Sequence, residues 1–241
     1  MEIIKKLAMK EENLHSCDGA TIAFLGDSVT QGCFECYLTS PTSLQTVFDY
    51  SSAYSTRIRE LLNILYPKAQ VNIINSGISG DSAPSGLQRL ERDILSRNPD
   101  LVVVSYGLND SVAGMKGLGT YASALEGIFS KLKAKGIEVI FLTQNFNCTK
   151  TSPHLRDELF INLSKNFAKT QNDGVLKAYF KKAKEICKTY GVKVCDLYPV
   201  WEKLADNGVD TTELLANKLN HPVREFHYYM AIKLIETMLL N

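Results

Sequence analysis

Four short polar motifs contain the residues of this sequence that are best suited to chemistry. They are Gly26-Asp27-Ser28, Gly77-Ile78-Ser79-Gly80, Gly107-Leu108-Asn109-Asp110 and Asn220-His221-Pro222. A serine just past a buried strand is well placed as an exposed nucleophile. The Asn109 amide can donate a hydrogen bond, and glycines let backbone amides approach a ligand. Taken singly, each motif is also typical of a turn or a helix cap.

The segment around Ser28 does not fit two better-known motifs. A phosphate-binding P-loop has four residues between its glycines and then a lysine, whereas five residues separate Gly26 from Gly32 and Cys33 follows. The G-x-S-x-G elbow of the α/β-hydrolases is absent because Thr30 stands at the position of its last glycine. Nucleotide binding and the α/β-hydrolase fold therefore lose their main support.

Alternating apolar runs and helical patterns must position these motifs. A continuous apolar run at 21–25 and similar, mainly apolar segments at 71–75, 101–105, 137–143 and 192–197 predict buried strands. Helical periodicity follows each run: residues 54–65 with Ser51 or Ser52 as N-cap, 87–95, 125–132 ending near Gly136, 175–190, and a last helix from near Pro222. This order predicts a three-layer α/β/α domain around a five-stranded parallel sheet, with the first three motifs at the carboxyl ends of strands.

Composition excludes several classes of protein. The chain has 27 Lys plus Arg against 26 Asp plus Glu, so its net charge of +1 favours neither nucleic acid nor an anionic membrane as partner. No apolar run is long enough to insert into a membrane, which predicts a cytoplasmic protein unless an export signal has been removed. We expect one domain over 1–241, with 1–19 as an N-terminal extension, and the oligomeric state is not indicated. Cys33 and Cys36 lack a second pair, so no metal site is expected.

Taken together, the four motifs resemble the blocks of the SGNH, or GDSL, hydrolase family, from about residue 20 to the end of the chain. The resemblance implies a flavodoxin-like SGNH hydrolase fold and an esterase that needs no cofactor or metal. It also implies that Ser28 is the nucleophile and His221 its general base. The oxyanion hole would be formed by the backbone amides of Ser28 and Gly80 and by the side chain of Asn109. Donors of this kind stabilise the negative charge that develops on an attacked ester carbonyl.

Two assignments have competitors within the sequence. A second Gly-Asp-Ser ends at Ser82, but Ser28 is preferred because Val29-Thr30 continues its block and the other blocks follow in family order. Three further histidines, at positions 15, 154 and 227, are expected to be structural or exposed. His227 comes six residues after His221, which turns it away from the same helix face.

One position departs from the family pattern. The family usually has an aspartate three residues before its histidine, where this chain has Lys218, and a cation cannot accept a hydrogen bond from the imidazole. The acceptor that orients His221 could be a backbone carbonyl, giving a Ser-His dyad, or a carboxylate or amide that folds nearby. The side-chain alternatives are Asp196, Asp210, Glu213, Asn217 and Asn220. Any of them would fix the imidazole tautomer.

The resemblance implies a small-molecule ester substrate without identifying it. We interpret 32–49 and 145–174 as the rim and wall of the pocket, and their polar character favours a short acyl group, such as acetyl, on a carbohydrate or another polar carrier. A lysophospholipase or thioesterase-type lipase is the alternative within the family. A non-catalytic binding module, which would hold Ser28 and His221 too far apart to hydrogen-bond, and a flavodoxin-like ligand binder are the alternatives outside it.

Overall fold

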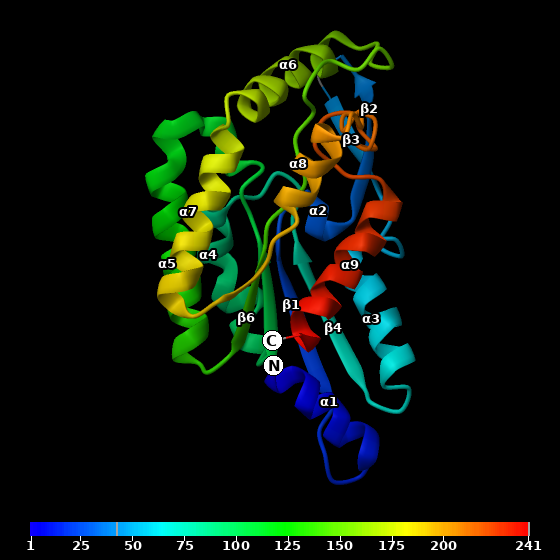
Figure 1. Ribbon diagram of the computed structural model, residues 1–241, viewed down its shortest axis with the longest axis vertical. Coiled ribbons are helices and arrows are strands. Elements are labelled where there is room, and N and C mark those ends of the chain that lie inside the picture. Colours follow the sequence, from blue (N-terminus) through cyan, green and yellow to red (C-terminus); the bar gives the residue numbers. More distant parts are fainter. Residues whose placement is uncertain (42, 241) are drawn as a thin grey trace.

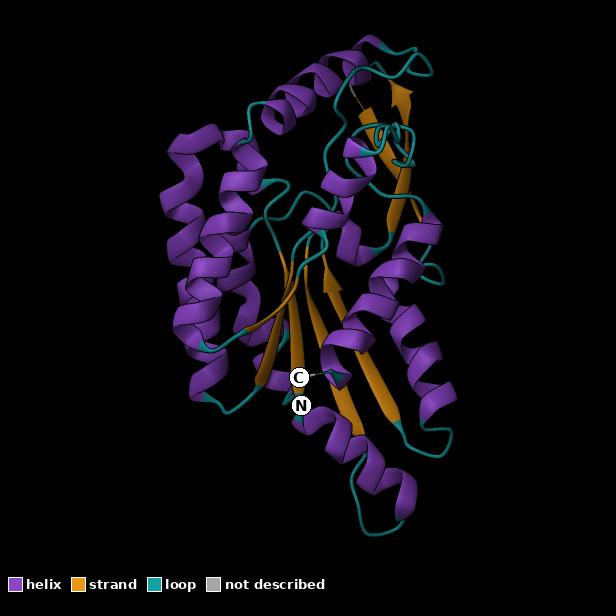
Figure 2. Cartoon of the chain, viewed as in Figure 1, coloured by secondary structure: helices purple, strands orange, loops and turns teal. Residues whose placement is uncertain are grey.

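The computed structural model describes residues 1–41 and 43–240. Its centre is a parallel sheet in the strand order β4-β1-β5-β6-β7 (Figures 1 and 2). The strands are β1 (Ala20–Gly26), β4 (Val71–Gly77), β5 (Leu101–Ser105), β6 (Glu138–Leu142) and β7 (Lys193–Cys195). The five segments thus form the predicted strands, although the edge strand β4 is only partly buried, and the α/β fold class is confirmed.

Helices cover both faces of the sheet (Figure 1). One face is covered by α3 (Tyr54–Leu65) and α9 (Arg224–Leu239), the other by α4 (Ala83–Asp93), α5 (Leu118–Ala134) and α7 (Val175–Tyr190). Two boundary predictions are wrong. The N-cap of α3 is Ala53, because Ser52 Oγ accepts a hydrogen bond from Arg57 instead. The last helix starts at Arg224, because Pro222 forms a β-bridge with Leu215.

The remaining elements lie around this three-layer body. They are α1 (Glu2–Glu12), α2 (Ser28–Gln31), β2 (Cys33–Ser40), β3 (Ser43–Phe48), α6 (Glu158–Asn172), α8 (Tyr198–Asp206) and the 3₁₀ helices Leu95–Arg97 and Asp110–Gly117. The segment 32–49, interpreted from the sequence as part of the rim and wall of the pocket, contains the antiparallel β2–β3 hairpin. Among the described residues, no helix combines the length and hydropathy that a membrane crossing requires.

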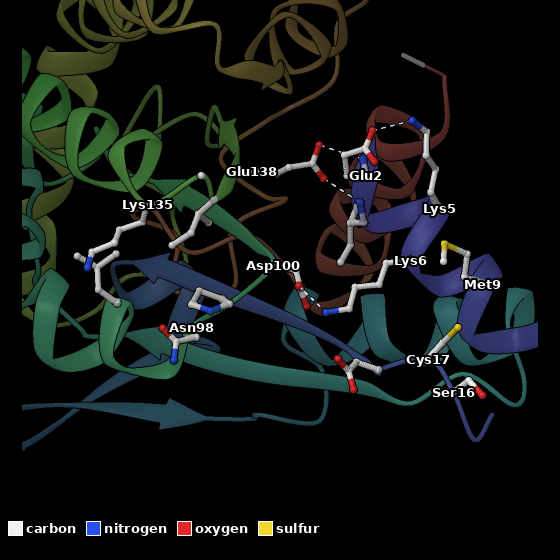
Figure 3. A pocket seen from close by; sticks show the side chains of 16 residues that line it. Glu2, Lys5, Lys6, Met9, Ser16, Cys17, Asn98, Asp100, Lys135 and Glu138 are labelled. Carbon is white, nitrogen blue, oxygen red and sulfur yellow. Dashed lines mark hydrogen bonds and ion pairs between the residues drawn. The ribbon is translucent and has the colours of Figure 1, made fainter. Parts of the chain in front are cut away.

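Helix α1 lies at the end of the sheet where the parallel strands begin. The Glu138 carboxylate accepts hydrogen bonds from the backbone amides of Glu2 and Ile3, at 3.0 and 2.8 Å, and so caps this helix (Figure 3). Lys6 pairs with Asp100 at 2.6 Å. These residues border a hollow of about 770 Å³ at the amino ends of the strands. The four polar motifs lie at the opposite end.

Candidate active site

Ser28 sits where the short helix α2 rests on the ends of two strands. The approach is so close that a Cβ on Gly26 would lie 2.1 Å from Thr30 Oγ1, and one on Gly77 would lie 2.2 Å from the Gln31 amide nitrogen. Glycine is therefore required at both positions. Asp27 caps the helix by accepting a hydrogen bond from the Val29 amide at 3.0 Å. Ser28 is the first residue of α2 and is only 4% exposed.

His221 contacts Ser28 directly. The distance from Ser28 Oγ to His221 Nε2 is 2.9 Å, and His221 Nδ1 lies 2.9 Å from the backbone carbonyl oxygen of Phe34. A carbonyl can only accept, so Nδ1 carries the hydrogen and Nε2 presents its lone pair to the serine hydroxyl. The binding-module alternative expected these two side chains to be too far apart to hydrogen-bond, and this distance contradicts it.

The protonation state of His221 suits a base. The side chain is 5% exposed, and burial is the main reason that its pKa falls to about 4. The Phe34 carbonyl and the negative charge of Glu35 act in the opposite direction but more weakly. His221 is therefore neutral near pH 7 and able to accept a proton.

Lys218 and the predicted acids have other partners. Lys218 Nζ pairs with the Glu213 carboxylate at 2.9 Å and donates to the Glu213 carbonyl at 2.9 Å. Asp196 accepts from Thr143 Oγ1 and pairs with Lys184, and Asp210 pairs with Lys150. Of the acceptors considered from the sequence, the structure places a backbone carbonyl, that of Phe34, against Nδ1.

The segment before His221 is held by amide side chains. Asn217 Oδ1 accepts hydrogen bonds from the backbone amides of Leu219, Asn220 and His221 at 2.9–3.0 Å. Asn145, just after β6, donates to the Asn220 carbonyl at 2.8 Å. Asn217 and Asn220 therefore position the backbone that carries His221 rather than its ring.

The residues predicted for the oxyanion hole lie on two neighbouring loops. Gly80 has a φ of +78°, and a Cβ there would meet no protein atom within 4 Å, so the backbone conformation is what favours glycine. Asn109 Nδ2 donates to the Asp81 carbonyl at 2.8 Å, which places its amide beside the Asp81–Ser82 peptide and leaves one N–H for another acceptor. Ser82, the alternative nucleophile, is the N-cap residue of α4.

Arg89, which no sequence motif singles out, ties these loops together. Its buried guanidinium donates to Asp81 Oδ2 at 2.8 Å, to the carbonyls of Gly26 and Ser76 at 3.0 and 2.6 Å, and to the Tyr106 hydroxyl at 2.9 Å. These partners come from the ends of β1, β4 and β5. No local pattern signals the role, because Gly26, Ser76 and Tyr106 lie 63, 13 and 17 positions from Arg89 in the sequence.

Gln144 connects two of the predicted motifs and is likewise not predicted from the sequence. Its Nε2 donates to Asp27 Oδ2 at 2.8 Å, while its Oε1 accepts from the Leu108 amide at 3.1 Å. Burial raises the pKa of Asp27 to about 7, although the bond from Gln144 opposes this. Gln144 directly follows the predicted strand 137–143, so the rule that directs attention to strand ends could have found it.

His227 and His154 lie in different environments. His227 is fully buried, its Nδ1 accepts from the Tyr54 amide at 3.2 Å, and burial lowers its pKa to about 3. His154 is exposed.

The tip of the β2–β3 hairpin and the start of α6, which belong to the two predicted rim segments, border a polar hollow of about 530 Å³.

The chain is similar to known proteins of one family. Residues 24–227 match the model of the GDSL-like lipase/acylhydrolase family. The chain is 29% identical over 92 residues to an acetylxylan esterase of Geobacillus stearothermophilus, covering 38% of this chain and 40% of that protein. It is 32% identical over 98 residues to an arylesterase of Vibrio mimicus, covering 38% of this chain and 48% of that one. These matches thus span less than half of either relative's length.

A solved structure shares the fold. The acetyl xylan esterase AlAXEase superimposes with a TM-score of 0.67 at 20% identity, over 91% of this chain and all of that one. The family match, which covers most of the chain, is independent of this structural likeness. The chain belongs to the GDSL-like lipase/acylhydrolase family.

Proposed function

We propose that this protein is a serine esterase in which Ser28 is the nucleophile and His221 the general base. The observation that carries the proposal is the pair of 2.9 Å contacts on the imidazole: Nε2 to Ser28 Oγ and Nδ1 to the Phe34 carbonyl. Ser28 Oγ attacks the ester carbonyl carbon while its proton passes to Nε2. The same proton then goes to the departing alcohol oxygen as the C–O bond breaks, which leaves an acyl-serine that water hydrolyses by the reverse sequence of transfers.

The oxyanion hole combines the Ser28 amide, the Gly80 amide and the Asn109 side chain. The Ser28 amide belongs to the first turn of α2, where backbone N–H groups lack helical partners. Asn109 keeps one N–H available after its bond to Asp81. Three donors on loops that Arg89 cross-links are fixed before the reaction starts, and losing one such donor costs about 2.7–4 kcal/mol of barrier.

The substrate class that fits these observations is an ester of a short acyl group: an acetyl ester on a carbohydrate or similar polar carrier. Ser28 and His221 are 4% and 5% exposed, which favours a small acyl group over a long chain. The acetylxylan esterase relative and the acetyl xylan esterase with the shared fold support the same class. The steps of the hydrolysis use the side chains and amides already named.

Hydrolysis of p-nitrophenyl acetate, p-nitrophenyl octanoate and an acetylated xylooligosaccharide tests the proposal. We expect the acetyl esters to be cleaved faster, and Ser28→Ala to lower kcat by at least about 10³-fold. Ser82→Ala is the matched control, since it removes the serine of the other Gly-Asp-Ser, and we expect it to keep wild-type activity. A fluorophosphonate probe should add its mass at Ser28.

Three results would contradict the proposal in different ways. Wild-type activity in Ser28→Ala would exclude Ser28 as the nucleophile. Loss of activity in Ser82→Ala alone would move the nucleophile to the second motif. A preference for the octanoate would leave the dyad standing but replace the acetyl substrate with a long-chain one, as in the lipase alternative.

A further inference from the structure

The carbonyl that orients His221 comes from an irregular part of the β2–β3 hairpin. The ladder pairs Cys33 with Phe48 and Cys36 with Thr46, and its register shifts between these pairs. Phe34 therefore lies in the irregular stretch, where its carbonyl accepts from His221 Nδ1. Because regular pairing does not extend through this stretch, the direction of the carbonyl depends on what holds the residues around it.

Arg224 contacts the side chains of Phe34 and Glu35, the two residues joined by the peptide bond that contains this carbonyl. Its guanidinium carbon lies 4.3 Å from the centroid of the Phe34 ring. Its Nη1 and Nη2 donate to the two carboxylate oxygens of Glu35 at 2.6 and 3.0 Å, and its Nε donates to Asp49 at 2.9 Å. The Phe34 carbonyl belongs to the planar peptide that joins Phe34 to Glu35, so fixing both side chains limits rotation of that plane.

The same contacts join the hairpin to the segment that carries the base. Arg224 is the first residue of α9 and follows His221 by three positions. His221 reaches the Phe34 carbonyl and Arg224 reaches Glu35, so two nearby residues of one segment bind two adjacent residues of the other. A bidentate arginine–carboxylate pair adds geometric specificity that a lysine cannot reproduce.

We propose that Arg224 is a positioning residue: with Glu35 it aims the Phe34 carbonyl at His221 Nδ1 and so holds the imidazole in the tautomer that accepts the Ser28 proton. This inference rests on the proposed function of Ser28 and His221. Arg224 takes no part in bond making or breaking. It supplies the orientation that an aspartate three residues before the histidine usually gives in this family.

Kinetics of Arg224→Met, Arg224→Lys and Glu35→Gln on p-nitrophenyl acetate test the inference. Methionine keeps an aliphatic stem without the guanidinium, and lysine keeps the charge without the fork. We expect Arg224→Met to lower kcat about 10–100-fold with KM almost unchanged, because a small misalignment of a reacting group has this effect. Lysine should recover part of the loss. Arg59→Met on the exposed face of α3 is the matched control and should behave as wild type.

A spectroscopic readout separates positioning from a purely structural role. In protein labelled with ¹⁵N-histidine, the His221 signals, assigned by their loss in His221→Gln, should report a proton on Nδ1 in the wild type. Arg224→Met should show a mixture of tautomers, and Arg59→Met should not. Circular dichroism and the melting temperature verify that each variant is folded.

The outcomes distinguish this inference from the proposed function. If Ser28→Ala is inactive while folded Arg224→Met keeps the wild-type kcat and tautomer, the positioning role is overturned and the esterase dyad stands. A lowered melting temperature with unchanged kcat and tautomer also overturns the positioning role, since Arg224 would then only stabilise the packing of the hairpin. If Ser28→Ala stays active, the proposed function fails, and an unchanged ¹⁵N spectrum in Arg224→Met would separately overturn the positioning role.

Discussion

Replacing Asp196, Asp210 and Glu213 one at a time by their amides should leave the esterase reaction almost unchanged. Each carboxylate is already engaged away from His221. Asp196 pairs with Lys184 at 2.8 Å, Asp210 with Lys150 at 2.6 Å, and Glu213 with Lys218 at 2.9 Å. The Nδ1 hydrogen of His221 is instead accepted by a main-chain oxygen, which none of these substitutions alters.

The size of the effect makes the test decisive. In a Ser-His-Asp triad, replacing the aspartate by asparagine lowers kcat about 10⁴-fold, which is about 5.4 kcal/mol of barrier. With the Phe34 carbonyl as acceptor, Asp196→Asn, Asp210→Asn and Glu213→Gln should each stay within about threefold of wild type, or about 0.7 kcal/mol. Surface ion pairs of this kind also contribute little to stability, so folding should be retained.

The assay is kcat on p-nitrophenyl acetate for each variant, with Ser28→Ala setting the background rate. Lys218→Met completes the series, because it removes the cation that occupies the usual aspartate position. A hundredfold fall in kcat for any one amide variant, with its melting temperature unchanged, would contradict this prediction. It would identify that carboxylate as the partner of His221 during the reaction and make the site a triad.

Three further predictions concern the pH dependence of the reaction, the contacts of Arg89 and the role of Gly80. Burial lowers the pKa of His221 to about 4, so the imidazole loses its proton as the pH rises through that value. The acid limb of kcat/KM should therefore fall near pH 4 in a pH–rate profile, and a limb near 6.5 would show that the imidazole is not buried in this way. Arg89→Met leaves the buried Asp81 carboxylate without its cation and should lower the free energy of unfolding by about 3–5 kcal/mol in urea, whereas a loss below about 1 kcal/mol would exclude the cross-linking role. Gly80→Ala and Gly136→Ala both place a side chain at a positive φ, +78° and +71°, with open space around the Cβ. Both variants should therefore lose about 1–2 kcal/mol of stability, and only Gly80→Ala should lose activity. Equal activities would remove Gly80 from the oxyanion hole.

The sequence predicts those parts of the structure that local patterns determine. The strand Leu101–Ser105 is apolar up to its last residue because it is buried on both faces, and the periodicity of 175–190 matches the helix that forms there. Ser28 and His221 follow from short motifs, and the rule about strand ends places Ser28 correctly. The extent of a single domain over 1–241 and the cytoplasmic location stay predictions.

The remaining features depend on contacts that no local pattern encodes. The acceptor of His221 is a main-chain oxygen, so the Phe34 side chain gives no sign of the role, and the two residues are 187 positions apart. Arg224 and Glu35 are separated by 189 positions. The β2–β3 hairpin escapes prediction because β2 shows no strict alternation of buried and exposed residues, only a buried start at Cys33 and an exposed end.

Ser28 and His221, the proposed nucleophile and base, are supported by different parts of the chain, which explains how this site can lack the usual aspartate. Ser28 and the oxyanion donors rest on strand ends that Arg89 cross-links, whereas His221 rests on the hairpin through Phe34. A carbonyl fixes the tautomer as well as a carboxylate does, but it carries no full charge to stabilise the imidazolium that forms during the reaction. Glu35, whose charge raises the pKa of His221, is the acid that the Arg224 contact holds beside this carbonyl. Glu35, on the hairpin, thus partly replaces the negative charge that an aspartate at position 218 would supply.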